Sequence, residues 1–242
     1  MNATIIIRRA MQIRFIVAAV TVLLAVSQAS AITTPNLLVD PSFENPALTP
    51  FGQIIGPPFT TGVWGGEVAA NVTGPVAGIS PASGLRMHRM DDDGGVATQS
   101  WQLVDLSPYT TAINAGNASV NFDALFNVPA NVAGGIGSLV VSFFTAAQTP
   151  VPPLITAAPF NADSIPPTWQ SFGLSGVAVP PTTQYVRLQL AFANASMQAP
   201  NGTQRPGFVD DARLTLTIVP EPSTIGLGSL AMAGLLWLRK RR

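Results

Sequence analysis

Few side chains in this chain could carry out catalysis. The sequence contains one histidine, His88, and no cysteine, which excludes thiolate nucleophiles and thiolate zinc sites. Any Ser-His-Asp triad would need His88, but no G-x-S-x-G motif lies near it, and we expect it to end a strand on a polar face. Glycosidases need two carboxyl groups across a cleft, and no spacing singles out such a pair. We therefore predict no catalytic residues.

Aromatic side chains could instead bind a ligand such as a sugar ring by stacking. Trp64 lies in a glycine-rich run at residues 61–66, and Tyr109 follows a proline. We predict that both rings are exposed in loops and bind ligand. Trp101 and Trp169 lie in strand-like runs, where a buried position in the core is more common.

The first 31 residues have the three parts of a signal peptide. Three arginines precede an apolar run at residues 15–26, and Ala29 and Ala31 form a small-x-small cleavage site. The run has 12 residues, which is too short to span a bilayer comfortably. We predict cleavage after Ala31 and export, with a retained signal anchor as the alternative.

The last 24 residues form a second targeting segment. Pro220, Glu221 and Pro222 are followed by an apolar run at residues 225–238 and four basic residues. This arrangement resembles the PEP-CTERM sorting signal of Gram-negative bacteria. The resemblance implies that residues 225–238 form a transmembrane helix in the inner membrane, and that an exosortase-type membrane transpeptidase cleaves the tail. A plain C-terminal anchor is the alternative.

The body between the two ends is acidic. Residues 32–219 contain five arginines, no lysine and 11 acidic residues, so their net charge is −6. This charge excludes nucleic acid as a partner, because nucleic-acid binding depends on cationic side chains. An exported domain without cysteine must be stabilised by packing or by a bound ion.

Alternating apolar residues predict strands throughout this body. The strand candidates are residues 120–128, 186–192, 212–218 and 138–146, with weaker ones at residues 84–90, 98–106 and 169–179. Proline pairs such as Pro152-Pro153 are expected to lie between strands, because proline removes a ladder donor. We therefore expect residues 32–218 to form one all-β domain, a two-sheet jelly-roll β-sandwich.

The two ends of the body carry a pair of motifs, N-L-L-V-D-P-S-F-E at residues 36–44 and G-F-V-D-D-A-R-L at residues 207–214. The pair resembles the galactose-binding-like jelly rolls, which include several carbohydrate-binding modules. The resemblance implies that the first and last strands pair and that a structural calcium ion is bound where they meet. Glu44 and Asp211 would then be ligands, with Asp210 as a competitor. Alternatively, these carboxylates cap turns and face solvent.

These observations predict an exported, non-catalytic protein of the cell surface or extracellular matrix. We expect it to bind extracellular polysaccharide in an exopolysaccharide or biofilm matrix. A structural surface protein without a small ligand is one alternative, and it predicts buried tryptophans. A carbohydrate-active hydrolase on the same scaffold is another.

Overall fold

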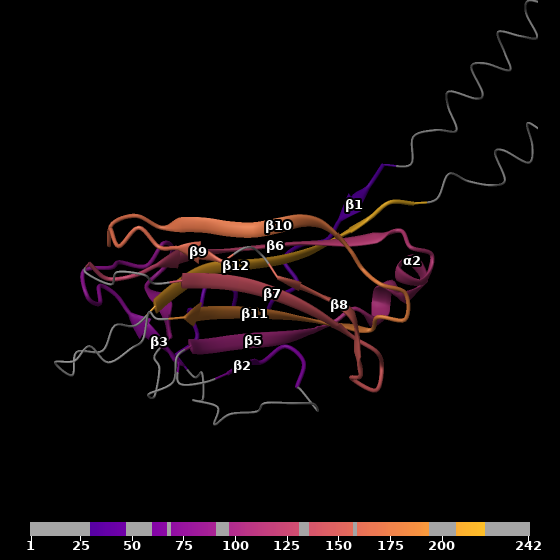
Figure 1. Cartoon of the computed structure of the whole chain (residues 1–242), viewed down its shortest axis with the longest axis horizontal. Helices are drawn as coiled ribbons and strands as arrows, with labels where there is room; N and C mark the ends of the chain where they lie inside the picture. Colours follow the sequence, from indigo (N-terminus) through magenta and orange to yellow (C-terminus); the bar gives the residue numbers. More distant parts are fainter. Residues whose placement is uncertain are drawn as a thin grey trace, which may run out of the picture. The chain divides into compact units, whose positions relative to one another are not determined.

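Two antiparallel β-sheets face each other in this protein, as the alternating apolar residues predict (Figure 1). The computed structural model describes residues 30–46, 60–66, 69–90, 97–130, 136–156, 159–193 and 207–220. The expectation of an all-β two-sheet sandwich is confirmed for these residues, and Thr33–Ile218 forms one compact unit. The predicted signal peptide with Ala29, the motif residues Glu221 and Pro222, and the predicted helix at residues 225–238 lie outside the described residues.

Sheet A has its longest strands in the middle. Its order is β10 (Gln170–Ala178), β6 (Ala118–Asn127), β12 (Gly207–Ile218), β4 (Arg86–Met90) and β3 (Ala69–Thr73), with β1 (Ile32–Thr33) beside β12. A register shift between Asp210 and Arg213 interrupts the pairing of β12 with β6. Such a bulge changes which side chains face the core on the two sides of it.

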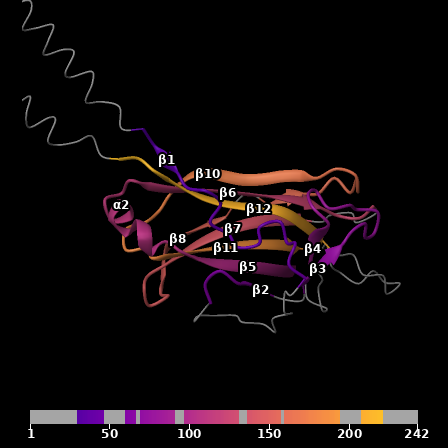
Figure 2. The same ribbon diagram turned by 180° about the vertical axis from the view of Figure 1, so that it is seen from behind.

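Among the described residues, sheet B contains the other six strands. Its order is β2 (Trp64–Gly66), β5 (Ala97–Asp105), β11 (Tyr185–Ala193), β7 (Ile136–Phe144) and β8 (Pro150–Thr156), with β9 (Phe160–Asn161) beside β7. A short helical segment, η1 (Ser107–Tyr109) and α2 (Thr110–Asn114), connects β5 to β6. It lies at the opposite end of the sandwich from β3 and β4 (Figure 2).

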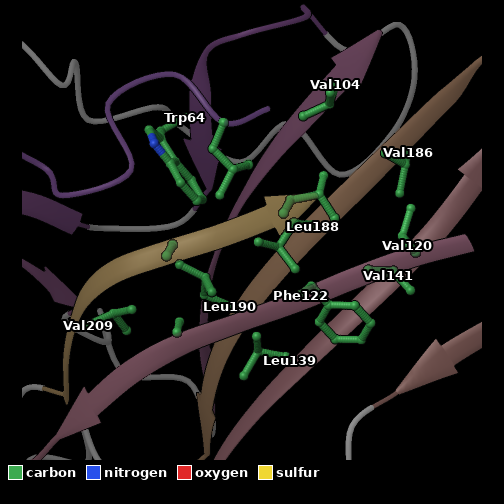
Figure 3. Packing of buried hydrophobic residues seen from close by; sticks show 14 of the residues in the cluster. Trp64, Val104, Val120, Phe122, Leu139, Val141, Val186, Leu188, Leu190 and Val209 are labelled. Atoms are coloured by element: carbon green, nitrogen blue, oxygen red, sulfur yellow. The ribbon is translucent and has the colours of Figure 1, made fainter. Parts of the chain in front are cut away.

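The core lies between the sheets and is built by strand periodicity. Every second residue of β6 and of β11 is buried, because successive side chains of a strand point to opposite faces. Figure 3 shows Val120 and Phe122 of β6 facing Leu188 and Leu190 of β11. Phe126 also meets Phe192 edge to face, with ring centroids 5.4 Å apart. Burying each such side chain contributes about 1.5–3 kcal/mol, which is what holds two sheets without disulfides together.

The first and last strands of the body pair, as the family resemblance implies. The amide of Thr34 donates to the carbonyl of Leu216 at 2.9 Å, and the amide of Leu37 donates to that of Leu214 at 2.8 Å. Between them, the side chain of Asn36 donates to the Ala212 carbonyl and accepts from the Leu214 amide. The side chain of Asn36 thus supplies two of the hydrogen bonds that connect the opening segment to β12.

One expectation about proline is wrong. Pro152 and Pro153 lie inside a strand, β8, and do not mark its end. β8 is at the edge of sheet B, and both prolines lie where its pairing with β7 shifts register, so no ladder hydrogen bond is lost at them. Among the described residues no helix is long and apolar enough to cross a membrane.

Candidate functional site

Trp64 is not the exposed ring that its glycine-rich surroundings predict. Its side chain is 3% exposed and points into the core among residues of both sheets (Figure 3). β2 pairs with β5 and so turns Trp64 inward, where its indole N–H donates to the carbonyls of Val39 at 3.0 Å and Asp40 at 3.2 Å. The prediction fails because a three-residue strand is too short to show alternation in the sequence.

Tyr109 is also not freely exposed. It is the last residue of η1 and directly precedes α2, and its half-buried side chain packs against the main core. The structure thus provides no exposed aromatic ring at either position that the sequence singled out.

His88 is buried between the sheets, so the expectation that it ends a strand on a polar face is wrong. Its Nδ1 lies 2.9 Å from Oδ1 of Asn71, and its Nε2 lies 2.9 Å from Oγ of Ser100. The ring stacks on Phe43, with centroids 4.6 Å apart. Burial lowers the pKa of His88 to about 3, so the imidazole is neutral at physiological pH. A histidine with 1% exposure cannot act as a general base on a substrate at the surface.

The three predicted calcium ligands meet around one turn, residues 82–86. Oε1 of Glu44 accepts hydrogen bonds from the amides of Leu85 at 2.9 Å and Arg86 at 3.0 Å. Asp210 is fully buried, and its Oδ2 accepts from the amide of Ala82 at 2.8 Å. Burial raises the pKa of Asp210 to about 6. These two carboxylates therefore bind the two ends of the turn, Asp210 at residues 82–83 and Glu44 at residues 85–86.

The partners of these carboxylates are hydrogen-bond donors. Oδ1 of Asp211 accepts from the hydroxyl of Ser83 at 2.7 Å, and Oδ1 of Asp210 accepts from the amide of Asp211 at 2.8 Å. Within the described ranges, no group of three or more acidic, histidine or cysteine residues is placed to hold a metal ion. These hydrogen bonds are the ones that the turn-capping alternative expects, and a calcium ion at Glu44 and Asp211 stays a prediction. The capping alternative expects all three carboxylates to face solvent. Asp210 does not, because its side chain is fully buried.

A polar and aromatic surface lies on the side of sheet B that faces away from the core. Its members, which we call the arginine face, are Gln99, Trp101 and Leu103 of β5, Tyr185, Arg187 and Gln189 of β11, and Ser142 and Phe144 of β7. Val186 and Leu188 of β11 are buried in the core, so the residues beside them in the chain point outward. Strand register then places Arg187 between Leu103 and Ser142.

Arg187 is the centre of the arginine face. Its guanidinium carbon lies 6.0 Å from the ring centroid of Trp101 and 5.6 Å from that of Phe144, which is within cation–π range. The Nη2 atom of Arg187 donates a long hydrogen bond of 3.4 Å to Oγ of Ser142. Burial lowers the pKa of Arg187 from its ordinary value. The guanidinium is therefore held in place by rings on both neighbouring strands.

The two sides of this centre carry further polar groups. Nε2 of Gln189 donates to Oε1 of Gln99 at 2.7 Å, which aligns two amides across the strands. Tyr185, Arg187 and Gln189 are half-buried, whereas Trp101 is 6% and Phe144 3% exposed. The β11 side chains are thus the accessible part of the face, and the two rings support them.

The C-terminal end of the chain matches a known protein family. Residues 219–242 match the family model of the PEP-CTERM protein-sorting motif. The chain carries a PEP-CTERM sorting motif. The sorting motif implies export and surface sorting by an exosortase, and it includes the predicted residues Pro220, Glu221 and Pro222. No curated protein matches the chain.

The body is similar in structure to carbohydrate-binding modules. TmCBM61 in complex with β-1,4-galactotriose is 14% identical, with a TM-score of 0.49 over 75% of this chain and 98% of that one. The C-terminal family 22 module of Clostridium thermocellum Xyn10B is 12% identical, with a TM-score of 0.42 over 75% and 92%. A xylan-binding domain from family 22 is also 12% identical, with a TM-score of 0.44 over 77% and 96%. At these identities the similarity concerns the β-sandwich alone.

Part of the arginine face could be predicted from the sequence. Arg187 and Gln189 alternate with buried residues in a strong strand pattern, so their outward direction follows from the sequence. Their neighbours Trp101 and Phe144 come from other strands, 86 and 43 positions away in numbering, and only pairing brings them together. The sorting motif could be found from the sequence alone, because its residues are contiguous and do not depend on strand pairing.

Proposed function

We propose that this protein is a non-catalytic surface domain that binds extracellular polysaccharide through the arginine face of sheet B. The observation that carries the proposal is the position of Arg187, over Trp101 and Phe144 and between Tyr185 and Gln189. Polysaccharides offer many hydroxyl groups and flat ring faces. The accessible part of this surface offers hydrogen-bonding groups on β11, Arg187 and Gln189, beside the half-buried ring of Tyr185.

The rigidity of the surface supports binding. All its members are in strands whose other side is buried in the core, so few degrees of freedom are lost when a ligand binds. Three adjacent strands span about 10 Å, since strands lie about 4.8 Å apart. A surface of that width can contact more than one sugar unit of a chain.

The sorting motif supports an extracellular location for this activity. We propose that the protein passes through the inner membrane with its tail, is cleaved by an exosortase-type transpeptidase, and then reaches the cell surface or extracellular matrix. Exopolysaccharide or biofilm polymers are available there as ligands. The acidic body supports the exclusion of nucleic acid as a competing polymer.

The placement of titratable groups supports a role without catalysis. The single histidine of the sequence is enclosed by Phe43, Asn71 and Ser100. Within the part of the chain that the structure describes, the arginine face has one carboxylate at its end, Asp105, which pairs with Tyr185. A glycosidase would need two carboxyl groups on opposite sides of a bound sugar.

A structural surface protein without a small ligand is the second candidate. The observation that favours it is the burial of Trp64 and Trp101, which are 3% and 6% exposed. Buried tryptophans provide core packing and leave no flat ring open to solvent. This candidate predicts that no polysaccharide changes the behaviour of the protein.

Affinity electrophoresis in gels containing neutral or acidic polysaccharides separates the two candidates. We expect at least one polysaccharide to retard the wild-type protein, and Gln189→Ala to reduce the retardation several-fold. Thr217→Ala on the outer side of sheet A is the control, because Thr217 belongs to the other sheet and should leave retardation unchanged. Equal mobility of the wild-type protein in all gels would support the structural candidate.

A further inference from the structure

We infer that the exosortase-type enzyme that processes the tail also contacts the folded body, at the end of sheet A where β12 leads into the sorting motif. This inference rests on the proposed processing of the tail and adds a surface of the body to what the enzyme recognises. It follows from how close the motif lies to β12, from how the end of β12 is held, and from the side chains around it.

The sorting motif begins almost directly after the sheet. β12 ends at Ile218 and the Pro-Glu-Pro sequence begins at Pro220, so only Val219 separates them. One extended residue spans at most about 3.6 Å. A cleft that binds an extended segment covers several residues, since each residue adds about 3.3 Å. An enzyme that encloses residues 220–222 therefore meets the end of the sandwich.

The end of β12 is held on both sides, so it cannot lengthen this segment without unpairing. Figure 1 shows β1 beside it, and Thr217 pairs with Ser119 of β6 on the other side. The hydroxyl of Thr217 lies 3.0 Å from that of Thr33 and accepts a hydrogen bond from Nδ2 of Asn121 at 3.0 Å. Because these bonds would be lost if the strand entered a cleft, contact with the intact end is favoured over unpairing.

The side chains around this exit are uncharged. Strand register places four residues side by side, which we call the exit row: Ala178 of β10, Ser119 of β6, Thr217 of β12 and Thr33 of β1. The body has five arginines and 11 acidic residues, but the nearest ones on β12 and β6 are Arg213 and Asp123. Each lies four positions from the row, about 13 Å along its strand. Interfaces between proteins are depleted of charged side chains at their centre, so the exit row is suited to a protein partner.

Two exposed aliphatic side chains lie next to the exit row in the chain. Ile32, which precedes Thr33, is 62% exposed, and Val219, which follows Ile218, is 52% exposed. They offer apolar area that a partner can bury. The carboxylate of Asp105 at this end of the sandwich belongs to sheet B, and it accepts a hydrogen bond from the amide of Ser107 at 2.7 Å.

The test follows loss of the tail from the full-length protein in its native host. The protein is pulse-labelled and recovered at intervals, and its intact mass reports removal of residues 1–31 and loss of the tail separately. We expect Ile32→Glu and Ala178→Glu each to slow tail loss about tenfold, because each places an unpaired carboxylate in the contact. Ile165→Glu is the matched control. Its side chain is 52% exposed, but it precedes the opposite end of β10 from Ala178, so tail loss should keep the wild-type rate.

A spacer separates contact with the body from steric hindrance by it. A flexible Gly/Ser spacer of about ten residues between Val219 and Pro220 lets the enzyme hold the motif away from the exit row. We expect the spacer to slow tail loss and to make the rates of the wild type and Ile32→Glu equal. An unchanged or faster rate with the spacer would overturn the inference, because it would mean that the body contributes nothing to recognition or obstructs it.

The outcomes separate this inference from the proposed function. If both charged variants lose the tail at the wild-type rate, the inference is overturned and processing of the tail stands. If the wild type never loses its tail, the inference and the proposed processing both fail, whereas polysaccharide binding is unaffected. Ile32 and Ala178 belong to different strands, so a folding defect in one variant leaves the other to decide.

Discussion

The imidazole of His88 and the hydroxyl of Ser100 join the two sheets, with Nε2 of the histidine 2.9 Å from Oγ of the serine. His88 belongs to β4 of sheet A and Ser100 to β5 of sheet B. On its other side the ring is bound to Asn71, whose amide also donates to the carbonyl of Asn45 at 2.7 Å. A polar chain thus runs from the opening segment through sheet A to sheet B, inside an otherwise apolar core.

We expect the stability of the fold to decrease on acidification because of His88. Its pKa is about 6.5 in the unfolded chain and about 3 in the folded protein, so protons bind the unfolded state first. The stabilisation is fully present above pH 6.5 and is lost as the pH falls toward 3, at up to about 1.4 kcal/mol per pH unit. Urea unfolding at several pH values should show this slope, and His88→Gln should remove it. Identical slopes in the two proteins would contradict the assignment.

Asp210 should have the opposite pH dependence. Burial raises its folded pKa to about 6 from 3.8, so its contribution is fully present below pH 3.8 and is lost as the pH rises through 6. Asp210→Asn should therefore lose stability on acidification from pH 6 to 4 more steeply than the wild type, as followed by the same urea titrations. A variant with an unchanged profile would show that the carboxylate is charged in both states.

Gly84→Ala should destabilise the protein more than Gly116→Ala. Both glycines have positive φ, +61° and +77°, which costs an alanine about 1–2 kcal/mol. At Gly84 the new Cβ would also overlap the carboxylate of Glu44 and displace it from the Leu85 and Arg86 amides, whereas nothing lies within 4 Å at Gly116. We expect an additional loss of about 1–3 kcal/mol at Gly84 in the free energy of unfolding. Equal losses would mean that Glu44 does not hold this turn.

Removal of calcium should leave the melting temperature unchanged. Glu44, Asp210 and Asp211 already accept hydrogen bonds from amides and a hydroxyl, so these bonds hold the turn without a cation. Thermal unfolding in EDTA and in millimolar calcium measures this directly. A melting temperature that rises and saturates with calcium would instead support the calcium site that the family resemblance implies, because a ligand that binds only the folded state stabilises it.

Processing of the tail should depend on the sorting motif. In its native host, the protein recovered from the medium should have an intact mass that lacks residues 1–31 and everything after about residue 222. Replacing Pro220, Glu221 and Pro222 by alanine should keep the tail attached and the protein in the membrane fraction. If the wild-type protein in the membrane fraction retains residues 225–238 and none is released, the tail is a plain anchor.

The local properties of this protein follow from its sequence. Burial of Val186, Leu188, Leu190 and Phe192 was predictable, because a strand turns successive side chains to opposite faces whatever its partners are. The sorting motif was equally predictable, since a processing enzyme recognises a contiguous segment. The acidic charge of the body and the absence of disulfides need no structure at all.

The candidate site and the buried polar chain depend on which strands pair. Trp101 meets Arg187 because β5 lies beside β11, and His88 meets Ser100 because β4 and β5 belong to opposite sheets. Trp64 is buried because β2 adds to the edge of β5, although its own three residues show no pattern. Strand order and register are set by the packing of the whole core and by the connections between strands. Contacts between residues far apart in the chain therefore exist only once the tertiary structure has formed.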